Sequence, residues 1–269
     1  MFDCTPNPTV SESIEKWPPT HRRPLMRMTW RSLSLIHWRV DPAIITPHLP
    51  AGLTLDTFDG TGWLGLVPFT MTDVSPRYVP RLPIRGLTDF HECNVRTYVT
   101  PTDGGPRGVW FFSLDAASRM AVSMARRFFH LPYFNARISL VERDGTITYG
   151  VDRLDPSPGN SPGHSSGHPL GTLRCAWTVD RSSQIDAPPG SLEHFLTERY
   201  VLFSANRAGR VFLGRVDHVP WTLRPAVLES LDESLIAADG LPPPDHAPDH
   251  IMAADPLAVT GWRLEALRG

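Results

Sequence analysis

Four polar side chains alternate along one predicted strand, residues 90–99 (FHECNVRTYV). Alternate residues of a strand point to the same side, so one face carries Glu92, Asn94, Arg96 and Tyr98. The planar guanidinium of Arg96 suits a carboxylate, Glu92 could act as a general base, and Tyr98 could donate to a carbonyl oxygen. The pattern is typical of a strand that borders a ligand cavity. The solvent face of an amphipathic strand has the same pattern, and a Glu–Arg pair there would contribute little.

The segment 125–133 (ARRFFHLPY) is a second candidate for the site. Arg126 or Arg127 could bring a cation to a pocket, and Tyr133 directly follows the rigid Pro132. A solvated helix end is an equally good interpretation, because arginines also interact favourably with the C-terminal helix dipole.

Two later groups give weaker signals. Tyr200 begins a predicted strand, and His218 and Trp221 follow the next one, where they could line the mouth of a cavity; a core histidine is the commoner environment. Histidines spaced four apart occur at 164 and 168 and at 246 and 250. Both pairs lie in Pro-rich loops without a regular set of carboxylates, so we expect no metal site, and the role of these loops stays open.

Cofactor motifs are missing from the sequence. It has no phosphate-binding loop, no dinucleotide glycine fingerprint and no Gly-x-Ser-x-Gly elbow. We therefore expect a chain that works without a cofactor.

The elements that must position these residues are mostly short strands. Alternation and turn signals predict strands at 28–40, 63–69, 90–99, 109–114, 135–141, 146–151, 171–179, 200–205 and 211–217. Helices are predicted at 116–128, capped by Asp115, after Ser191, and at 225–238. Residues 1–24 form an irregular arm, and 73–89, 155–170 and 240–250 form loops. The expected fold is mainly β with a few helices, a closed or nearly closed barrel formed by one domain at 25–269.

Composition excludes several broad classes. The 269 residues are 41% hydrophobic and 20% charged, with a net charge of −2. This balance argues against a disordered chain, a nucleic-acid partner or an anionic membrane surface. There is no apolar run of the roughly 18–20 residues that a membrane helix needs, and the first residues lack signal-peptide order. We expect a cytoplasmic protein with a small-molecule partner; the sequence leaves a homo-oligomer open.

Lysine is almost absent from the chain. Lys16, in the predicted arm, is the only lysine among 26 basic residues. A Schiff-base mechanism in a core pocket therefore has one poorly placed candidate.

Several motifs together resemble a known family. They include Asp56–Gly60, Trp63–Phe69, the strand around Glu92, Gly108–Asp115, Leu131–Tyr133, Leu196–Tyr200 and His218–Trp221. Over roughly 25–240 the chain is similar to domain-of-unknown-function family 2071, which looks like a distant branch of the acetoacetate-decarboxylase-like superfamily. The resemblance implies a closed β-barrel around a buried, largely apolar pocket. It implies no settled activity.

One departure from the superfamily bears on mechanism. In the decarboxylases a Gly-aromatic-Pro-Lys segment supplies the lysine that forms an imine with the β-keto acid. Here the comparable run ends Leu131-Pro132-Tyr133, so the resemblance places Tyr133 where that lysine would be. The superfamily's strand glutamate looks matched by Glu92. Imine-dependent decarboxylation should therefore be absent.

Three functional hypotheses follow. The first is an enzyme of the lyase, dehydratase, isomerase or cyclase type that uses general acid–base chemistry on a carbonyl- or carboxylate-bearing metabolite. Its catalytic residues would be Glu92, Arg96 and Tyr133, and its substrate-binding residues Asn94, Tyr98, Arg126, Tyr200, His218 and Trp221. The second is a non-catalytic binding protein for an apolar or aromatic metabolite. The third is an interaction protein whose pocket is filled by side chains.

Overall fold

The computed structural model describes residues 23–76, 88–156 and 170–267. The predicted arm at 1–24 and most of the predicted loops at 73–89 and 155–170 lie outside these residues. Within them, no helix is both long and apolar enough to cross a membrane.

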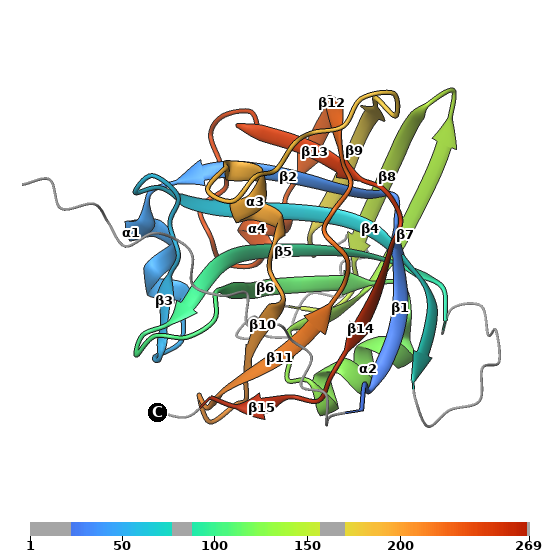
Figure 1. The fold of residues 1–269 in the computed structure, drawn as a ribbon. Coiled ribbons are helices and arrows are strands. Elements are labelled where there is room, and N and C mark those ends of the chain that lie inside the picture. Colours follow the sequence, from blue (N-terminus) through green and yellow to red (C-terminus); the bar gives the residue numbers. More distant parts are fainter. Residues whose placement is uncertain (1–22, 77–87, 157–169, 268–269) are drawn as a thin grey trace, which may run out of the picture.

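Twelve strands of the described chain form a closed ring (Figure 1). In ring order they are β1 (Met26–Arg31), β14 (Leu257–Gly261), β11 (Val211–Asp217), β10 (Val201–Ala205), β6 (Gly108–Ala116), β7 (Tyr133–Arg143), β8 (Thr146–Arg153), β9 (Thr172–Val179), β12 (Leu223–Glu233), β13 (His250–Ala254), β2 (Leu33–Val40) and β4 (Gly62–Pro76). The ring closes because β4 pairs with β1. The predicted fold, mainly β with a closed or nearly closed barrel, is confirmed, although the ring is irregular in shape rather than a uniform barrel.

A further strand, β5 (Phe90–Pro101), lies inside the ring and divides it. β5 pairs antiparallel with β4 on one side and with β6 on the other. These three strands run side by side across the centre of the molecule in Figure 1. Two short strands add to the edges: β3 (Leu53–Leu55) pairs with β5 and β15 (Glu265–Ala266) pairs with β11.

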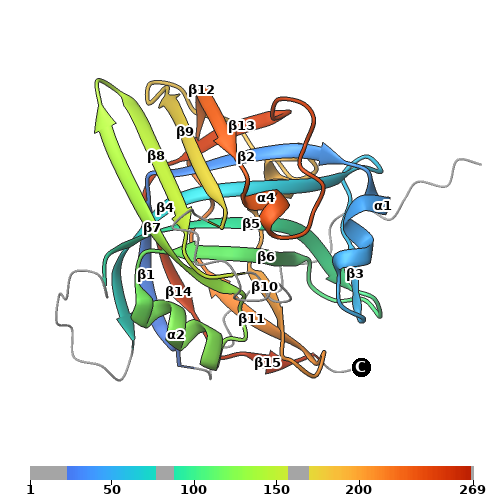
Figure 2. The same cartoon turned by 180° about the vertical axis from the view of Figure 1, so that it is seen from behind.

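The two faces of β5 contact two separate hydrophobic clusters. Phe90 and Tyr98 belong to one cluster, which includes Val259 of β14. Cys93 and Val95 point the other way and pack in a second cluster with side chains from β8 and β9, the strands that rise away from β5 in Figure 2. A single strand with a period of two therefore serves as a wall for both cores.

The helix after β6 begins later than the sequence predicts. α2 (Arg119–Phe128) is capped by Ser118, whose side chain accepts a hydrogen bond from the backbone N–H of Ala121. Asp115 was the predicted cap, and this prediction is wrong. Its carboxylate is fully buried and accepts two hydrogen bonds from Arg153, at 2.8 and 2.7 Å.

The helix predicted at 225–238 is wrong over most of its length. Residues Leu223–Glu233 form β12, and only Leu235–Ala238 form the helical turn α4. β12 pairs with β9 along seven residues of each strand, with a bulge between Leu228 and Ser230. Pairing with a distant strand thus overrides the helical composition of the segment.

The remaining helices are short. They are α1 (Pro42–Ile45), a 3-10 turn (Thr46–His48) and α3 (Leu192–Thr197). The predicted opening of a helix after Ser191 is confirmed, because the Ser191 hydroxyl accepts from the backbone N–H of His194. α3 places Leu196 and Thr197 beside the face of β5 that carries Glu92 and Tyr98.

Candidate active site

A cavity of about 570 Å³ lies between the face of β5 that carries Glu92 and the strands β1, β4, β6, β10, β11 and β14. Apolar side chains make up most of its lining. The exposed lining residues gather at one end: Met120 and Met124 of α2, Arg27 of β1, and Asp73 and Asp89 near the ends of β4 and β5. This end, beside α2, is the mouth of the cavity.

Three polar side chains of β5 face the cavity in sequence. Glu92, Asn94 and Arg96 line it, and each is two residues from the next. Successive side chains of β5 therefore point alternately into this cavity and into the second hydrophobic cluster, as the sequence pattern predicts. Because β5 begins beside exposed Asp89, the row leads from the mouth inward.

Glu92 and Tyr133 form a hydrogen-bonded pair. The Tyr133 hydroxyl donates to Oε2 of Glu92 at 2.9 Å. Tyr133 is the first residue of β7, which pairs in parallel with β6, and Leu114 of β6 is the register partner of both Tyr133 and Asn94. Two strand pairings, rather than closeness in sequence, bring the phenol to the carboxyl group.

Burial sets the protonation of this pair. It raises the pKa of Glu92 to about 8; the hydrogen bond from Tyr133 lowers this pKa, and the nearby Asp115 raises it further. Burial, followed by the charge of Glu92, raises the pKa of Tyr133 well above its ordinary value. At neutral pH the site therefore holds a mostly protonated carboxyl group and a neutral phenol.

Arg96 presents a cation that no described carboxylate pairs with. Its Nη2 donates weakly to the Tyr98 hydroxyl at 3.4 Å and to the carbonyl of Leu196 at 3.3 Å. Its buried Nε has no hydrogen-bond partner in the described chain. An unpaired guanidinium in an apolar cavity favours an anionic ligand, because an anion offsets the cost of burying the charge.

Asn94 is a second polar group that can still form a hydrogen bond. It is buried, and its Oδ1 has no partner within the described residues. A side-chain amide between Glu92 and Arg96 can meet either a donor or an acceptor of a ligand.

Tyr98 takes part in the site from behind Arg96. The Tyr98 hydroxyl donates to the carbonyl of Leu196 at 2.9 Å, and His37 Nε2 lies 2.7 Å from the same hydroxyl oxygen. His37 must then donate through Nε2. Burial, and next the Arg96 charge, lower the pKa of His37 well below its ordinary value, so the imidazole is neutral. Tyr98 is fully buried and does not line the cavity.

The backbone of β4 leaves room for this arrangement at Gly65. Gly65 is the register partner of both Arg96 on β5 and His37 on β2. A Cβ at this position would lie 3.0 Å from His37 Nε2 and 3.4 Å from Cγ of Arg96. A glycine in this buried strand thus permits the close approach of the two side chains.

Of the other predicted residues, Trp221 lines the cavity and three do not. Trp221 donates through Nε1 to the carbonyl of Thr197 at 2.9 Å. Tyr200 stacks on His218 at 4.6 Å between ring centroids, and the hydroxyl of Tyr200 bonds to Glu198. His218 meets Trp221 edge-on at 5.1 Å between ring centroids and so supports it directly, while Tyr200 supports His218.

Arg126 lies on the outer surface of α2. It donates to the backbone carbonyl of Tyr133 and to Asp155, each at 2.6 Å. The same Asp155 oxygen accepts from the backbone N–H of Asn135. Arg126 therefore fixes the start of β7, and with it Tyr133, without reaching the cavity.

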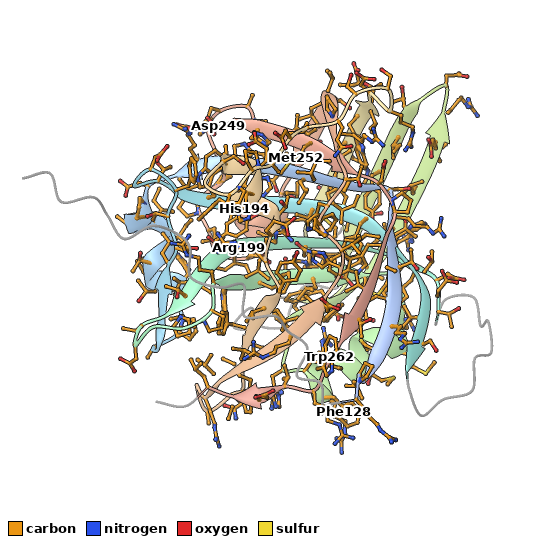
Figure 3. The ribbon with its side chains drawn as sticks, viewed as in Figure 1. Phe128, His194, Arg199, Asp249, Met252 and Trp262 are labelled. Atoms are coloured by element: carbon orange, nitrogen blue, oxygen red, sulfur yellow. The ribbon has the colours of Figure 1, made fainter. Side chains whose placement is uncertain are left out.

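Sequence reasoning missed several lining residues. Trp30 of β1 stacks on Trp221 at 5.8 Å, and buried Arg199 lines the cavity while its Nη1 is held by Asp56 at 2.6 Å. Figure 3 shows Arg199 near the middle of the molecule and Trp262, another lining residue, toward the α2 end beside Phe128. The cavity extends between these two regions. Such residues meet only in the folded chain, so no spacing rule could have identified them.

The histidine loops give no metal centre in the part of the chain that is described. His164 and His168 lie outside the described residues. His246 bonds to Asp245 and Asp249, and His250 bonds to Glu193. No group of three or more potential ligands gathers among residues 23–76, 88–156 and 170–267.

Comparisons of sequence identify relatives without an assigned activity. A family model described as an uncharacterized conserved protein, domain-of-unknown-function family 2071, matches residues 27–258. The uncharacterized protein YqjF of Bacillus subtilis (strain 168) is 35% identical over 224 residues, which cover 83% of this chain and 85% of that protein.

Comparisons of structure identify the fold. The enduracididine biosynthesis enzyme MppR, complexed with pyruvate, aligns with a TM-score of 0.62 at 16% identity and covers 96% of this chain and 93% of the other. Acetoacetate decarboxylase from Legionella pneumophila aligns over the same shares with a TM-score of 0.55 at 14% identity. At these identities the likeness establishes an acetoacetate-decarboxylase-like fold and nothing further.

Proposed function

The chain belongs to domain-of-unknown-function family 2071, and from this membership and the cavity we propose that it is an enzyme that moves protons next to a carbonyl group of a carboxylate-bearing small molecule. Glu92 is the proton carrier, Tyr133 the hydrogen-bond donor to the carbonyl oxygen, and Arg96 the anchor for the carboxylate. The chemistry proceeds without a Schiff base.

The observation that carries this proposal is the pair formed by Glu92 and Tyr133. A carboxyl group that is 2% exposed and accepts one hydrogen bond at 2.9 Å faces an apolar cavity large enough for a ligand. Burying such a group without a charged partner is costly. A buried carboxyl group with a shifted pKa in a cavity is typical of a residue that transfers protons.

The pair can perform enolisation in a balanced sequence. Ionised Glu92 takes a proton from the carbon next to the carbonyl; the C–H electron pair forms the new C=C bond, and the π pair of the C=O bond moves onto the oxygen. Glu92, now protonated, can donate to the oxygen of Tyr133, whose own hydrogen turns to the enolate oxygen. Where the substrate has a C=C bond next to the enolate, return of the proton to the far carbon of that bond gives isomerisation. Where it has a β-hydroxyl, that hydroxyl leaves with the proton of Glu92 as water while the enolate electrons form a C=C bond, which gives dehydration.

Structural neighbours support the ligand class. One neighbour is MppR with the condensation product of pyruvate and imidazole 4-carboxaldehyde, and another is MppR with pyruvate, a 2-oxo acid. These titles concern MppR; for this chain they support a ligand that carries both a carbonyl group and a carboxylate.

The near absence of lysine supports chemistry without an imine. Lys16 lies far in sequence from β5 and β7, and the described ranges contain no lysine. Tyr133, which the resemblance places at the imine lysine's position, donates to Glu92 rather than offering an amine.

A second candidate function is a binding protein for an apolar or aromatic metabolite. The observation that favours it is the stack of Trp30 on Trp221 beside the cavity, with an interplanar angle of 21°. In that case the ligand would bind without chemical change, and Glu92 would be dispensable.

Deuterium exchange tests the enzyme proposal directly. The protein is incubated in D₂O with 2-, 5- and 7-oxo carboxylic acids, and NMR follows the loss of hydrogen next to each carbonyl. We expect exchange above the uncatalysed rate for at least one acid, rising with pH toward a plateau above about 8 because ionised Glu92 is the base.

Variants assign the exchange to the pair. Glu92→Gln should reduce it at least a hundredfold, as general base loss does, while the exposed control Glu142→Gln should leave it unchanged. Exchange that survives Glu92→Gln would overturn the assignment of the base. No exchange with any acid that binds would favour the binding protein.

A further inference from the structure

We propose that the ligand of this cavity is an elongated, amphiphilic oxo acid. Its carboxylate binds Arg96 at the inner end, its carbonyl group lies several bonds away beside Glu92 and Tyr133, and its apolar tail lies between Met120, Met124 and Trp262 at the mouth. The inference rests on the proposed function and adds the length and polarity of the substrate.

The polar groups along β5 are widely spaced. Glu92 and Arg96 are four residues apart on one face of an antiparallel strand. At roughly 3.4 Å per residue their Cα atoms are about 13 Å apart. The carboxyl and ketone carbons of a 3-oxo acid are only about 2.5 Å apart. A 3-oxo acid could therefore place its carboxylate at Arg96 and its ketone at Glu92 together only if the two side chains leaned toward each other.

The side chain of Arg96 points toward Tyr98. Its Nη2 contacts the Tyr98 hydroxyl and the Leu196 carbonyl, and its guanidinium carbon lies 5.6 Å from the centre of the Tyr98 ring. Tyr98 is the next residue on this face beyond Arg96. The guanidinium thus leans away from Glu92, and the ligand must span the gap past Asn94.

The electrostatics agree with two separate polar centres. The Arg96 charge acts on His37, whose pKa it lowers after burial. The charge that acts on Glu92 is that of Asp115. Arg96 and Glu92 therefore contact different parts of a ligand, the anion at the inner end and the carbonyl nearer the mouth.

The space toward the mouth is large and mostly apolar. Cavities of 300–1,000 Å³ suit ligands much larger than a four-carbon acid, and this one measures about 570 Å³. A short acid would leave most of an apolar space empty or filled with water that finds few polar partners. A long apolar tail fills it.

Methionines line this space in unusual number. Five of the chain's seven methionines are lining residues among the described residues: Met26, Met28, Met71, Met120 and Met124. Met120 and Met124 are 49% and 40% exposed on α2. Methionine side chains are flexible and adapt to different apolar shapes. Their position predicts that the cavity accepts apolar ligand tails of different shapes but is selective for the carboxylate and carbonyl groups of the ligand.

Binding measurements test the head and the tail separately. Butyrate, octanoate, dodecanoate and 1-dodecanol serve as probes, followed by calorimetry and by the fluorescence of the lining tryptophans. We expect octanoate to bind more tightly than butyrate by up to about fourfold per added methylene that becomes buried. Arg96→Met should weaken the acids at least tenfold and leave 1-dodecanol within twofold.

A variant at the mouth isolates the tail. Met124→Glu places a charge where the tail would lie, so it should weaken dodecanoate at least tenfold and butyrate by less than twofold. Val227→Glu is the matched control, because Val227 is 62% exposed on β12 and does not line the cavity. Affinity that does not depend on chain length, or on Arg96, would overturn the inference.

Exchange measurements separate this inference from the proposed function. Deuterium exchange next to the carbonyl is compared for 3-oxo- and 7-oxododecanoate after subtraction of the uncatalysed rates. Faster enzymatic exchange of the 7-oxo acid supports both claims. Exchange confined to 3-oxododecanoate overturns the separation of carboxylate and carbonyl group and keeps the enzyme. Binding of long acids through Arg96 without any exchange keeps the ligand class and overturns the enzyme.

Discussion

At the scale of single residues, the environment of Glu92 gives it a proton affinity that an exposed glutamate lacks. The folded protein holds its proton up to a pH of about 8, whereas the ordinary pKa is 4.5. Between these values the folded state binds one proton more than the unfolded chain. The free energy of unfolding therefore falls as the pH rises through this interval, by about 1.4 kcal/mol per pH unit from this group.

Glu92→Gln should remove this dependence. The variant keeps an amide that can accept from Tyr133 and carries no charge to bury. We expect the difference in unfolding free energy, variant minus wild type, to become steadily more positive from pH 5 to about pH 8 and to level off above it. Urea unfolding at several pH values measures this difference.

Exposed Glu142 supplies the control, since Glu142→Gln should give a difference that changes little with pH. Asp239, whose pKa is raised to about 6 mainly by burial, titrates in both proteins and cancels in the comparison. A difference for Glu92→Gln that stays flat from pH 5 to 8 would show that Glu92 is ionised in the folded state.

The sequence predicts single residues well only where local geometry decides. Alternation placed Glu92, Asn94 and Arg96 on one face, and all three line the cavity. The same rule placed Tyr98 with them, yet its hydroxyl is bound by His37 of β2 and Leu196 of α3. Those partners are 61 and 98 residues away, beyond any local pattern.

At the scale of elements, Arg153 joins three of them. This fully buried side chain, the last residue of β8, bonds to Asp115 of β6 and to Asp239 at the end of α4, the latter at 2.6 Å. Ser113 also donates to Asp239. The cluster anchors β6, which pairs with the cavity wall β5.

Asp115→Asn should destabilise the fold strongly. It leaves the buried guanidinium with one carboxylate, and breaking a buried ion pair costs about 3–5 kcal/mol. Glu142→Gln breaks a pair with Arg181 in which both side chains are about half exposed, so it should cost less than about 1 kcal/mol. Chemical denaturation measures both. Equal costs for the two variants would contradict an anchoring role for Arg153.

Elements were predictable where period and turn signals agreed. The hairpin predicted at 135–151 is β7 and β8, with Asp144 and Gly145 of its turn at positive φ. The segment 225–238 failed because its alanine-, leucine- and glutamate-rich composition favours a helix locally, while its pairing with β9 is decided about 50 residues away.

At the scale of the whole molecule, the divided ring explains why one side of β5 can hold a cavity. The second cluster, with fully buried Trp177 and Val151, packs against the back of β5. Stability can therefore come from that side, while the side with Glu92 and Arg96 remains open to a ligand. The resemblance could predict a closed barrel around a pocket, but the division by β5 depends on pairings that only the folded chain shows.

The composition of the whole chain limits its covalent chemistry with oxo acids. Lys16 is the only lysine, so no side-chain amine between residues 23 and 267 can form an imine with an oxo acid. Borohydride reduction in the presence of an oxo acid should therefore leave the peptides of the domain without an added mass by mass spectrometry. Lys16→Arg should keep the deuterium exchange that Glu92 supports, because arginine retains the charge but forms no imine under these conditions. A reduced adduct at Lys16 together with loss of exchange in Lys16→Arg would replace the acid–base mechanism with an imine mechanism.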